Sequence, residues 1–145
     1  MSTEAAVSFD HINLNTIDPN SMKAPIGVPM KFIVTSAERK SYSNDNGEGK
    51  YTTFKFTVTD NETFSGRSFY TSLFDDKAGS KNPSARQLRI LMDATGVPQT
   101  EGTEFSDWLA ELVAQRAEFS APLKSYTTKK GEVKTEPDIF KALPA

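Results

Sequence analysis

The sequence contains no cysteine, and this absence removes several kinds of chemistry at once. Disulfide bonds, thiolate metal sites, iron–sulfur clusters and a cysteine nucleophile are all excluded. Histidine is almost as scarce, since His11 is the only one. It has no histidine or carboxylate partner at the spacing of a metal site, so we expect a surface residue rather than a metal ligand or a catalytic base.

Long apolar runs are also missing. No stretch approaches the roughly 20 apolar residues that cross a bilayer as a helix. The first seven residues, Met-Ser-Thr-Glu-Ala-Ala-Val, lack the basic and apolar regions of a secretion signal. We therefore expect a cytosolic protein that has no membrane partner.

Catalytic motifs are absent as well. The sequence has no Gly-x-Ser-x-Gly, no phosphate loop and no histidine pair. Asp75 and Asp76 are adjacent, which points them apart in a strand and leaves them in solvent in a turn, unlike the carboxylates of a two-metal site. Residues 41–49 fail as a calcium loop, because Tyr42 and Thr53 would occupy its first and twelfth positions. We expect neither an enzyme nor a bound cofactor or metal.

Positive charge is not in excess either. The net charge is −2, with a pI near 5.5, which argues against a protein that coats duplex nucleic acid by bulk charge. The charges are nevertheless segregated: residues 101–111 hold four acids and no base, whereas residues 116–134 hold five bases and two acids. An acidic total can therefore include one basic face, which is all that single-strand binding needs.

What the sequence does contain is a clear alternation between residues 50 and 60. Such a period of two predicts a half-buried strand. A second extended segment follows after residues 60–62, so residues 49–74 are predicted to form an antiparallel hairpin. The inward side chains of the first strand would be Thr52, Phe54, Phe56 and Val58.

The outward side of this strand carries Tyr51, Lys55 and three threonines, where a purely solvated strand more often carries Glu and Lys. Such a face can stack on bases and pair with the phosphates of a nucleic-acid strand. It can equally be an ordinary exposed sheet, since Thr and Tyr favour strands wherever they lie. The residues alone leave both interpretations open.

Three further strands and two helices are expected around the hairpin. The first helix is capped by Asn82 or Ser84 and ends at Gly96, with an apolar stripe that includes Ala85, Leu91 and Thr95. Its flank carries Arg86 and Arg89, which face solvent or could touch phosphate. The expected ranges are strand 30–40, loop 41–49, hairpin strands 50–60 and 64–74, helices 84–95 and 105–115, and strands 117–126 and 133–140.

Three residues in the second half lead to specific expectations. Trp108 lies on the apolar side of the second helix, which favours a place in the core over a role in base stacking. Pro122 lacks an N–H group, so its strand should lie at a sheet edge or carry a bulge. Gly131 should supply the positive φ of the last hairpin turn.

The order of three strands, two helices and two strands is that of an OB-fold barrel. The predicted fold class is mainly β with two helices: a five-stranded OB-fold-like barrel with the helices inserted between strands 3 and 4. Closure of the sheet would remove exposed edges. Other small barrels and α+β sandwiches share this order. Residues 26–145 would form a single OB-fold-like domain, and residues 1–25 a partly ordered N-terminal arm.

Several strings make the sequence similar to a group of phage-encoded OB-fold single-stranded-DNA-binding proteins. They are the strand over residues 49–58, the Phe-x-Gly-Arg-x-Phe of residues 64–69, residues 84–88 with 94–97, and the hairpin of residues 119–133. The resemblance covers about residues 27–140. It implies a protein of the host-cell cytoplasm that binds single-stranded DNA without sequence specificity, in phage DNA replication or recombination.

In such a protein, cations would neutralise phosphates and tyrosine rings would stack on bases. Replication or recombination proteins, or further copies of the chain, would be its other partners. Tyr42 could add a ring, and Arg67 could instead lie at a buried edge beside a carboxylate. The alternative is a non-enzymatic structural or protein-interaction barrel, in a virion or an assembly, without nucleic-acid binding. The implied binding residues are Tyr51, Lys55, Arg67, Tyr70, Lys50, Lys124, Tyr126, Lys129, Lys130 and Lys134.

Overall fold

The structure, a computed structural model, describes residues 10, 13–16, 26–45, 47–60, 64–75 and 83–145. Most of the predicted N-terminal arm therefore lies outside the described residues, as do His11, Asp76 and Asn82. Within the arm, one short 3-10 helix, η2 (Leu14–Thr16), is described.

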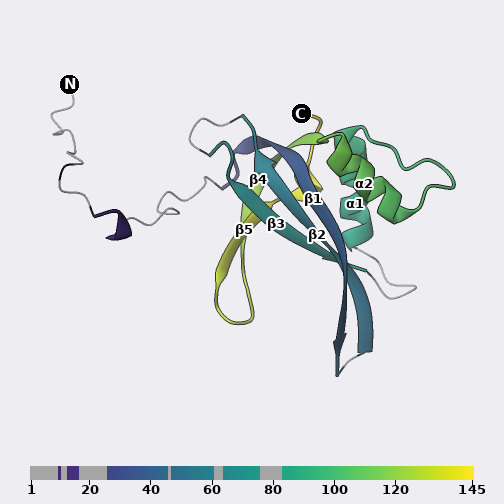
Figure 1. Cartoon of the computed structure of the whole chain (residues 1–145), viewed down its shortest axis with the longest axis horizontal. Coiled ribbons are helices and arrows are strands. Elements are labelled where there is room, and N and C mark those ends of the chain that lie inside the picture. Colours follow the sequence, from purple (N-terminus) through teal and green to yellow (C-terminus); the bar gives the residue numbers. More distant parts are fainter. Residues whose placement is uncertain (1–9, 11–12, 17–25, 46, 61–63, 76–82) are drawn as a thin grey trace.

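The described chain is built on a five-stranded sheet with the strand order β3-β2-β1-β4-β5 (Figure 1). All neighbouring pairs are antiparallel. Two helices lie between β3 and β4, and a 3-10 helix follows β5. The prediction of a mainly β protein with two helices between the third and fourth strands is confirmed. The elements are β1 (Pro29–Asn44), β2 (Gly47–Val58), β3 (Ser68–Phe74), α1 (Pro83–Thr95), α2 (Phe105–Ala114), β4 (Glu118–Thr127), β5 (Val133–Pro137) and η3 (Ile139–Lys141).

The two edge strands, β3 and β5, approach each other. Cα atoms of the two strands come within 8 Å. Among the described residues, however, no backbone hydrogen bond joins them. The sheet is therefore not closed by hydrogen bonds, and we call the gap between β3 and β5 the seam.

Phenylalanine supplies much of the core. The Phe32 and Phe119 rings stack at a centroid distance of 5.6 Å, and Phe56 meets Phe119 edge to face at 5.0 Å. Each buried ring removes about 150–250 Å² from water. The alternation predicted for the second strand is confirmed, because the buried residues of this part of β2 are Thr52, Phe54, Phe56 and Val58.

The predicted loop over residues 41–49 is wrong. β1 continues to Asn44 and β2 begins at Gly47, so the two strands form a long hairpin that projects from the body (Figure 1). Tyr42 pairs with Gly49 in this ladder, and its ring occupies the space that a side chain on Gly49 would need. The glycine-rich composition suggested a loop, but the ladder pairing and this cross-strand contact hold the segment as strand.

β4 is not an edge strand, contrary to the expectation from Pro122. Residues 118–122 of β4 pair with β1, and residues 123–127 pair with β5. Pro122 thus lies where β4 changes partner, and its carbonyl accepts a hydrogen bond from the Asp138 N–H at 2.8 Å. A missing N–H is tolerated at this position because one ladder ends there and the other begins.

The helices cover one side of the sheet, with α2 against β1 and α1 against β4 and η3. Trp108 is buried and donates from Nε1 to the Val97 carbonyl at 2.8 Å, which confirms its place in the core. The predicted stripe of α1 is wrong at Ala85, which is exposed, because the packing against η3 turns the helix so that Gln87 and Leu91 face inward. Neither described helix has the length and hydropathy needed to cross a bilayer.

Candidate nucleic-acid interface

One side of β2 and β3 points away from the core. Side chains that lie opposite each other in an antiparallel pair share a face, and in this sheet Tyr51 lies opposite Phe74 and Lys55 opposite Tyr70. The residues on both sides of Lys55 and Tyr70 are buried, as are Thr52 beside Tyr51 and Leu73 beside Phe74, so these four side chains point outward. Together with Tyr42 of β1, they define what we call the outer face.

Three rings form a cluster at one end of the outer face. Tyr51 and Phe74 stack with centroids 5.1 Å apart and an interplanar angle of 26°. Tyr42 lies 5.8 Å from Phe74 and 6.2 Å from Tyr51. Phe74 is still 50% exposed, so the rings support one another without entering the core. The cluster is an apolar platform open to solvent.

Tyr70 lies further along the outer face and is 59% exposed. Lys55 lies opposite it on β2 and is half-buried. A ring beside an ammonium group suits a polynucleotide, because a base stacks on the ring while a phosphate meets the cation. The predicted outward placement of Tyr51 and Lys55 is confirmed.

A hollow of about 530 Å³ continues from Tyr70 across the outside of the seam. Arg67 and Tyr70 line it on the β3 side. Tyr126 and Lys134, which lie opposite each other in the β4–β5 ladder, line it on the other side. The hollow therefore brings together two rings and two cations that are far apart in the sequence.

Arg67 lies just before β3. Its guanidinium stacks over the rings of Phe64 and Phe69, with distances of 5.8 and 5.4 Å to the ring centroids. Such stacking restricts the side chain and holds it at the wall of the hollow.

Lys124 is half-buried and points outward as predicted, but two carboxylates surround its charge. Its Nζ lies 3.7 Å from Glu136 Oε1 and 4.0 Å from Asp138 Oδ1. Burial raises the pKa of Glu136, an effect that Lys124 only partly opposes. Lys124 therefore belongs to an ion cluster beside the hollow and is less available to a phosphate than Lys134 is.

Three other predicted cations lie outside the path from Lys55 to the seam hollow. Lys50 lines one hollow with Arg39 and the start of α2, and another with Tyr42 in the β1–β2 hairpin. Lys129 and Lys130 are exposed in the turn between β4 and β5, beyond the seam hollow. Gly131 closes this turn with φ of +83°, as predicted.

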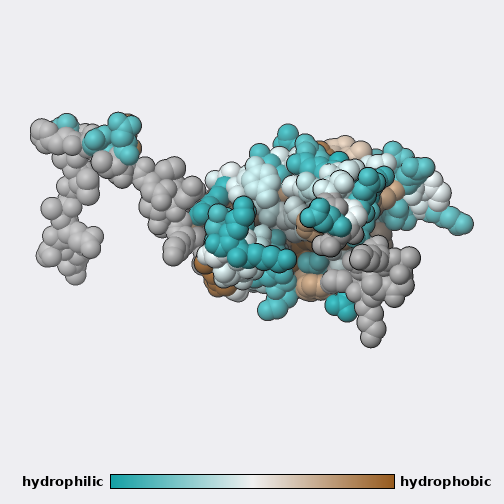
Figure 2. Space-filling model, turned by 90° about the horizontal axis from the view of Figure 1, so that it is seen from below, coloured by the Kyte–Doolittle hydropathy of each residue, from teal (hydrophilic) through white to brown (hydrophobic). Residues whose placement is uncertain are grey.

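Sequence reasoning missed Phe74 and placed Tyr42 in a loop. Phe69, Thr71 and Leu73 alternate inward, which puts Phe74 on the same face as Tyr70. The outward position of Phe74 could therefore have been predicted from the pattern of β3. Seen from the side to which the two hairpins point, the described residues are largely hydrophilic, with small hydrophobic patches among them (Figure 2).

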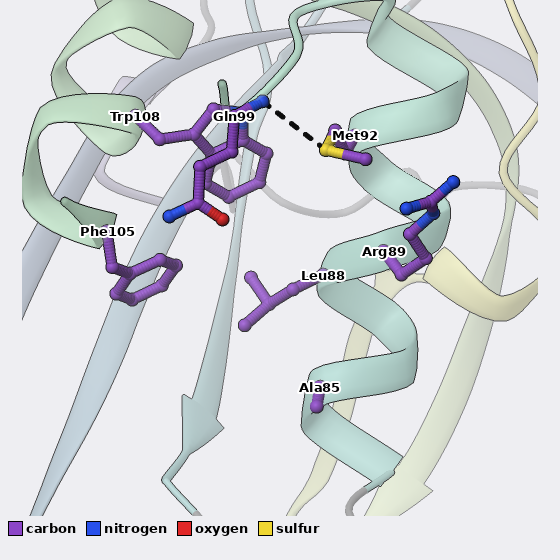
Figure 3. A pocket seen from close by; sticks show the side chains of 7 residues that line it. All are labelled: Ala85, Leu88, Arg89, Met92, Gln99, Phe105 and Trp108. Carbon is purple, nitrogen blue, oxygen red and sulfur yellow. Dashed lines mark hydrogen bonds between the residues drawn. The ribbon is translucent and has the colours of Figure 1, made fainter. Parts of the chain in front are cut away.

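A different hollow, of about 280 Å³, lies between α1 and α2 (Figure 3). Leu88, Phe105 and Trp108 give it apolar walls. Arg89 at its rim pairs with Asp93 at 3.2 Å, and Arg86 lies over the Phe140 ring, so neither arginine joins the outer face. Within the described ranges, no three His, Cys, Asp or Glu side chains gather as a metal site.

No protein-family model matches this chain, and no curated protein matches it. The candidate interface therefore rests on its geometry: a ring platform, an exposed tyrosine beside a lysine, and a hollow with two rings and two cations.

Proposed function

We propose that the protein binds single-stranded DNA without sequence preference and acts in DNA replication or recombination, as the resemblance to phage-encoded single-strand binders implies. The observation that carries the proposal is the arrangement on the outer face. The exposed Tyr70 lies directly opposite Lys55, and the stacked pair Tyr51–Phe74 lies two outward positions along the same two strands, outside the core. Each base stacked on such a ring contributes about 1–3 kcal/mol.

Local charge supports the proposal despite the acidic total. The outward residues of β2 opposite β3, and those of β3 itself, include no acid, and Lys55 is the one charged side chain in this described set. The hollow adds Arg67 and Lys134. On the adjoining β1, Glu38 lies opposite Thr53 and pairs with Lys40 at 3.8 Å, so this acid has a cation beside it. Phosphates on the path over β2, β3 and the hollow meet cations, while the acidic α2 lies against β1 on the helix side of the sheet.

The hydroxyl groups of the outer face favour binding without sequence preference. Thr53 bonds Ser72 at 3.2 Å, and Thr57 bonds both Ser68 at 3.1 Å and Thr35 at 2.7 Å. Because these hydroxyls already have partners in the sheet, they are not poised to read base edges. Recognition then rests on ring faces and phosphates, which every nucleotide offers.

The strand order and the approach of β3 to β5 support an OB-fold barrel whose seam lacks backbone hydrogen bonds. Proteins of that fold bind oligonucleotides on the face of strands 2 and 3 and through the loops that join strands 1 and 2 and strands 4 and 5. Here the ring platform lies at the base of the β1–β2 hairpin, and the hollow adjoins the β4–β5 hairpin.

The test is fluorescence anisotropy with a labelled oligothymidylate. We expect binding at low salt, weaker binding as salt rises, and at least about a tenfold loss when Tyr51 and Lys55 are both replaced by Ala. The matched control replaces Phe140 and Lys141, also a ring and a lysine, on η3 beside α1. It should bind like the wild type.

A wild-type chain that binds no oligonucleotide at low salt contradicts the proposal. Self-association or capture of a protein through the same rings would then point to the structural or protein-interaction barrel.

A further inference from the structure

A charged cluster lies in the seam next to the hollow. Glu136 of β5 lies opposite Lys124 of β4, and Asp138 follows just after β5. The Glu136 side chain is only 15% exposed, and the single ammonium of Lys124 lies within 4.0 Å of both carboxylates. One cation thus opposes two partly buried acids.

Thr71 of β3 meets this cluster from across the seam. Its Oγ1 is buried and makes no hydrogen bond of standard geometry within the described part of the chain. The hydroxyl is still close enough to Glu136 to lower the pKa of that carboxyl, against the larger effect of burial, which raises it. Glu136 of β5 therefore faces Thr71 of β3 across the seam, where the two backbones do not bond.

The cluster is coupled to the hollow through the β4–β5 ladder. The pair Tyr126–Lys134 lies one outward position along from the pair Lys124–Glu136, and both of its side chains line the hollow. Burial raises the pKa of Tyr126, and the charge of Glu136 raises it further. The charge on Glu136 therefore affects Tyr126, which lines the hollow.

We propose that Glu136 is a positioning residue for single-strand binding: its carboxyl holds β5 against Thr71 and holds Lys124 away from the strand in the hollow. This inference rests on the proposed function. The ionised carboxylate retains Lys124 and repels approaching phosphates. The neutral carboxyl can donate a hydrogen bond to Thr71 Oγ1, and it no longer attracts Lys124, whose charge is then shared between Asp138 and an approaching phosphate.

Binding is therefore linked to uptake of one proton from solvent by Glu136. The groups that face this carboxyl are Lys124 and Tyr126 from β4, Thr71 from β3 and Asp138 beyond β5. Asp138 shares Lys124 with Glu136, and its side chain is also only 16% exposed, but of the two carboxyls Glu136 is the one that faces Thr71 and Tyr126. Affinity should rise as the pH falls through the raised pKa of Glu136, by on the order of threefold to tenfold, since one charge near a phosphate is involved.

The first test needs no nucleic acid. In the free full-length protein, the side-chain carboxyl signal of Glu136 and the backbone amide signals of Thr71 are followed by NMR between about pH 8 and pH 4. We expect Thr71 to shift with the titration of Glu136, and this shift to disappear in Glu136→Gln. If the chemical shift of the Thr71 amide does not change as Glu136 titrates, the inference is overturned, whether or not DNA binds.

The second test measures the affinity for a labelled oligothymidylate over the same pH range. Glu136→Gln should bind more tightly than the wild type at about pH 8, with a flatter pH profile, whereas Glu132→Gln in the adjoining turn should keep the wild-type profile. The three proteins differ only at the substituted carboxyl, so the difference between the wild-type and Glu136→Gln profiles reports Glu136.

A Glu136→Gln profile that parallels the wild type overturns the inference, as does weaker binding at every pH. Failure of the wild type to bind at any pH refutes the proposed function instead, and the NMR result then stands by itself.

Discussion

Arg39 and Asp75 form a two-pronged ion pair that ties the end of β3 to β1. Arg39 NH1 donates to Asp75 Oδ1 at 2.6 Å, and NH2 donates to Oδ2 at 2.7 Å. NH1 also donates to the buried Thr52 hydroxyl at 3.1 Å, and the guanidinium lies 5.2 Å from the centroid of the Phe105 ring. One side chain thus contacts β2, the end of β3 and α2, which places Phe74 next to Tyr51.

We expect Asp75→Asn to lower the free energy of unfolding by about 0.5–1 kcal/mol at neutral pH, because the pair is partly exposed. The hydrogen bonds from Arg39 lower the pKa of Asp75. Its stabilising effect is therefore present above the unfolded-state pKa and is lost as the pH falls through the lower folded-state pKa. Urea unfolding of both proteins across this range should show the difference shrinking in acid.

The control for this pair is Asp93→Asn, which removes the exposed ion pair with Arg89 on α1. It should change the free energy of unfolding by less than about 0.5 kcal/mol. Equal effects of the two substitutions would show that the bidentate geometry of the Arg39–Asp75 pair adds nothing to the free energy of unfolding.

The ring platform can be tested by fluorescence, because Trp108 is the only tryptophan and is buried. Adding oligonucleotide to the wild type should leave the tryptophan emission unchanged. Phe74→Trp puts an indole into the platform, and stacking of a base should then quench its emission. Quenching in the wild type, or none in Phe74→Trp under conditions where anisotropy shows binding, would place the nucleic acid elsewhere.

Lys55 and Lys50 lie on different sides of β2, so they make a matched pair of variants. Lys55→Gln should reduce the slope of log affinity against log salt concentration by about 0.7, the value for one phosphate contact on a single strand. Lys50→Gln should leave the slope unchanged. Equal changes in both variants would indicate general electrostatic attraction rather than a contact path over the outer face.

Gly49 and Tyr42 should be coupled. The Tyr42 ring fills the space next to Gly49, so Gly49→Ala forces this surface ring out of its position and should cost about 0.5–1.5 kcal/mol of stability. In a Tyr42→Ala background the same substitution should cost much less. A double-mutant cycle by thermal unfolding measures the coupling, and additive effects would mean that the ring yields without strain.

The sequence predicted the parts of the fold that alternation controls, together with the end of α1 at Gly96, whereas the proposed N-cap Ser84 lies inside the helix. The inward Phe54 and Phe56 and the outward Tyr51 and Lys55 followed from a period of two. The extension of β1 to Asn44 did not follow from the sequence, because residues 41–44 have the composition of a loop and are held as a strand by pairing with β2.

The candidate site was harder to predict because its residues meet only through tertiary structure. Arg67 and Lys134 line one hollow because β3 approaches β5, a contact between distant segments that no local pattern encodes. The ion cluster around Lys124 could not be predicted for the same reason. The alternation of β4 showed that Lys124 points outward, but Glu136 comes close to Lys124 only because β5 pairs with β4.

β4 joins two parts of the sheet. The half that precedes Pro122 is bonded to β1, and the half that follows it is bonded to β5. Further backbone bonds hold the chain on both sides of this point, because the Gly27 N–H donates to the Leu123 carbonyl at 3.0 Å and Ser120 exchanges two hydrogen bonds with Leu143. The β4–β5 hairpin is thus anchored next to Pro122, so the spacing between β3 and β5 depends on the same strand whose Phe119 packs in the core.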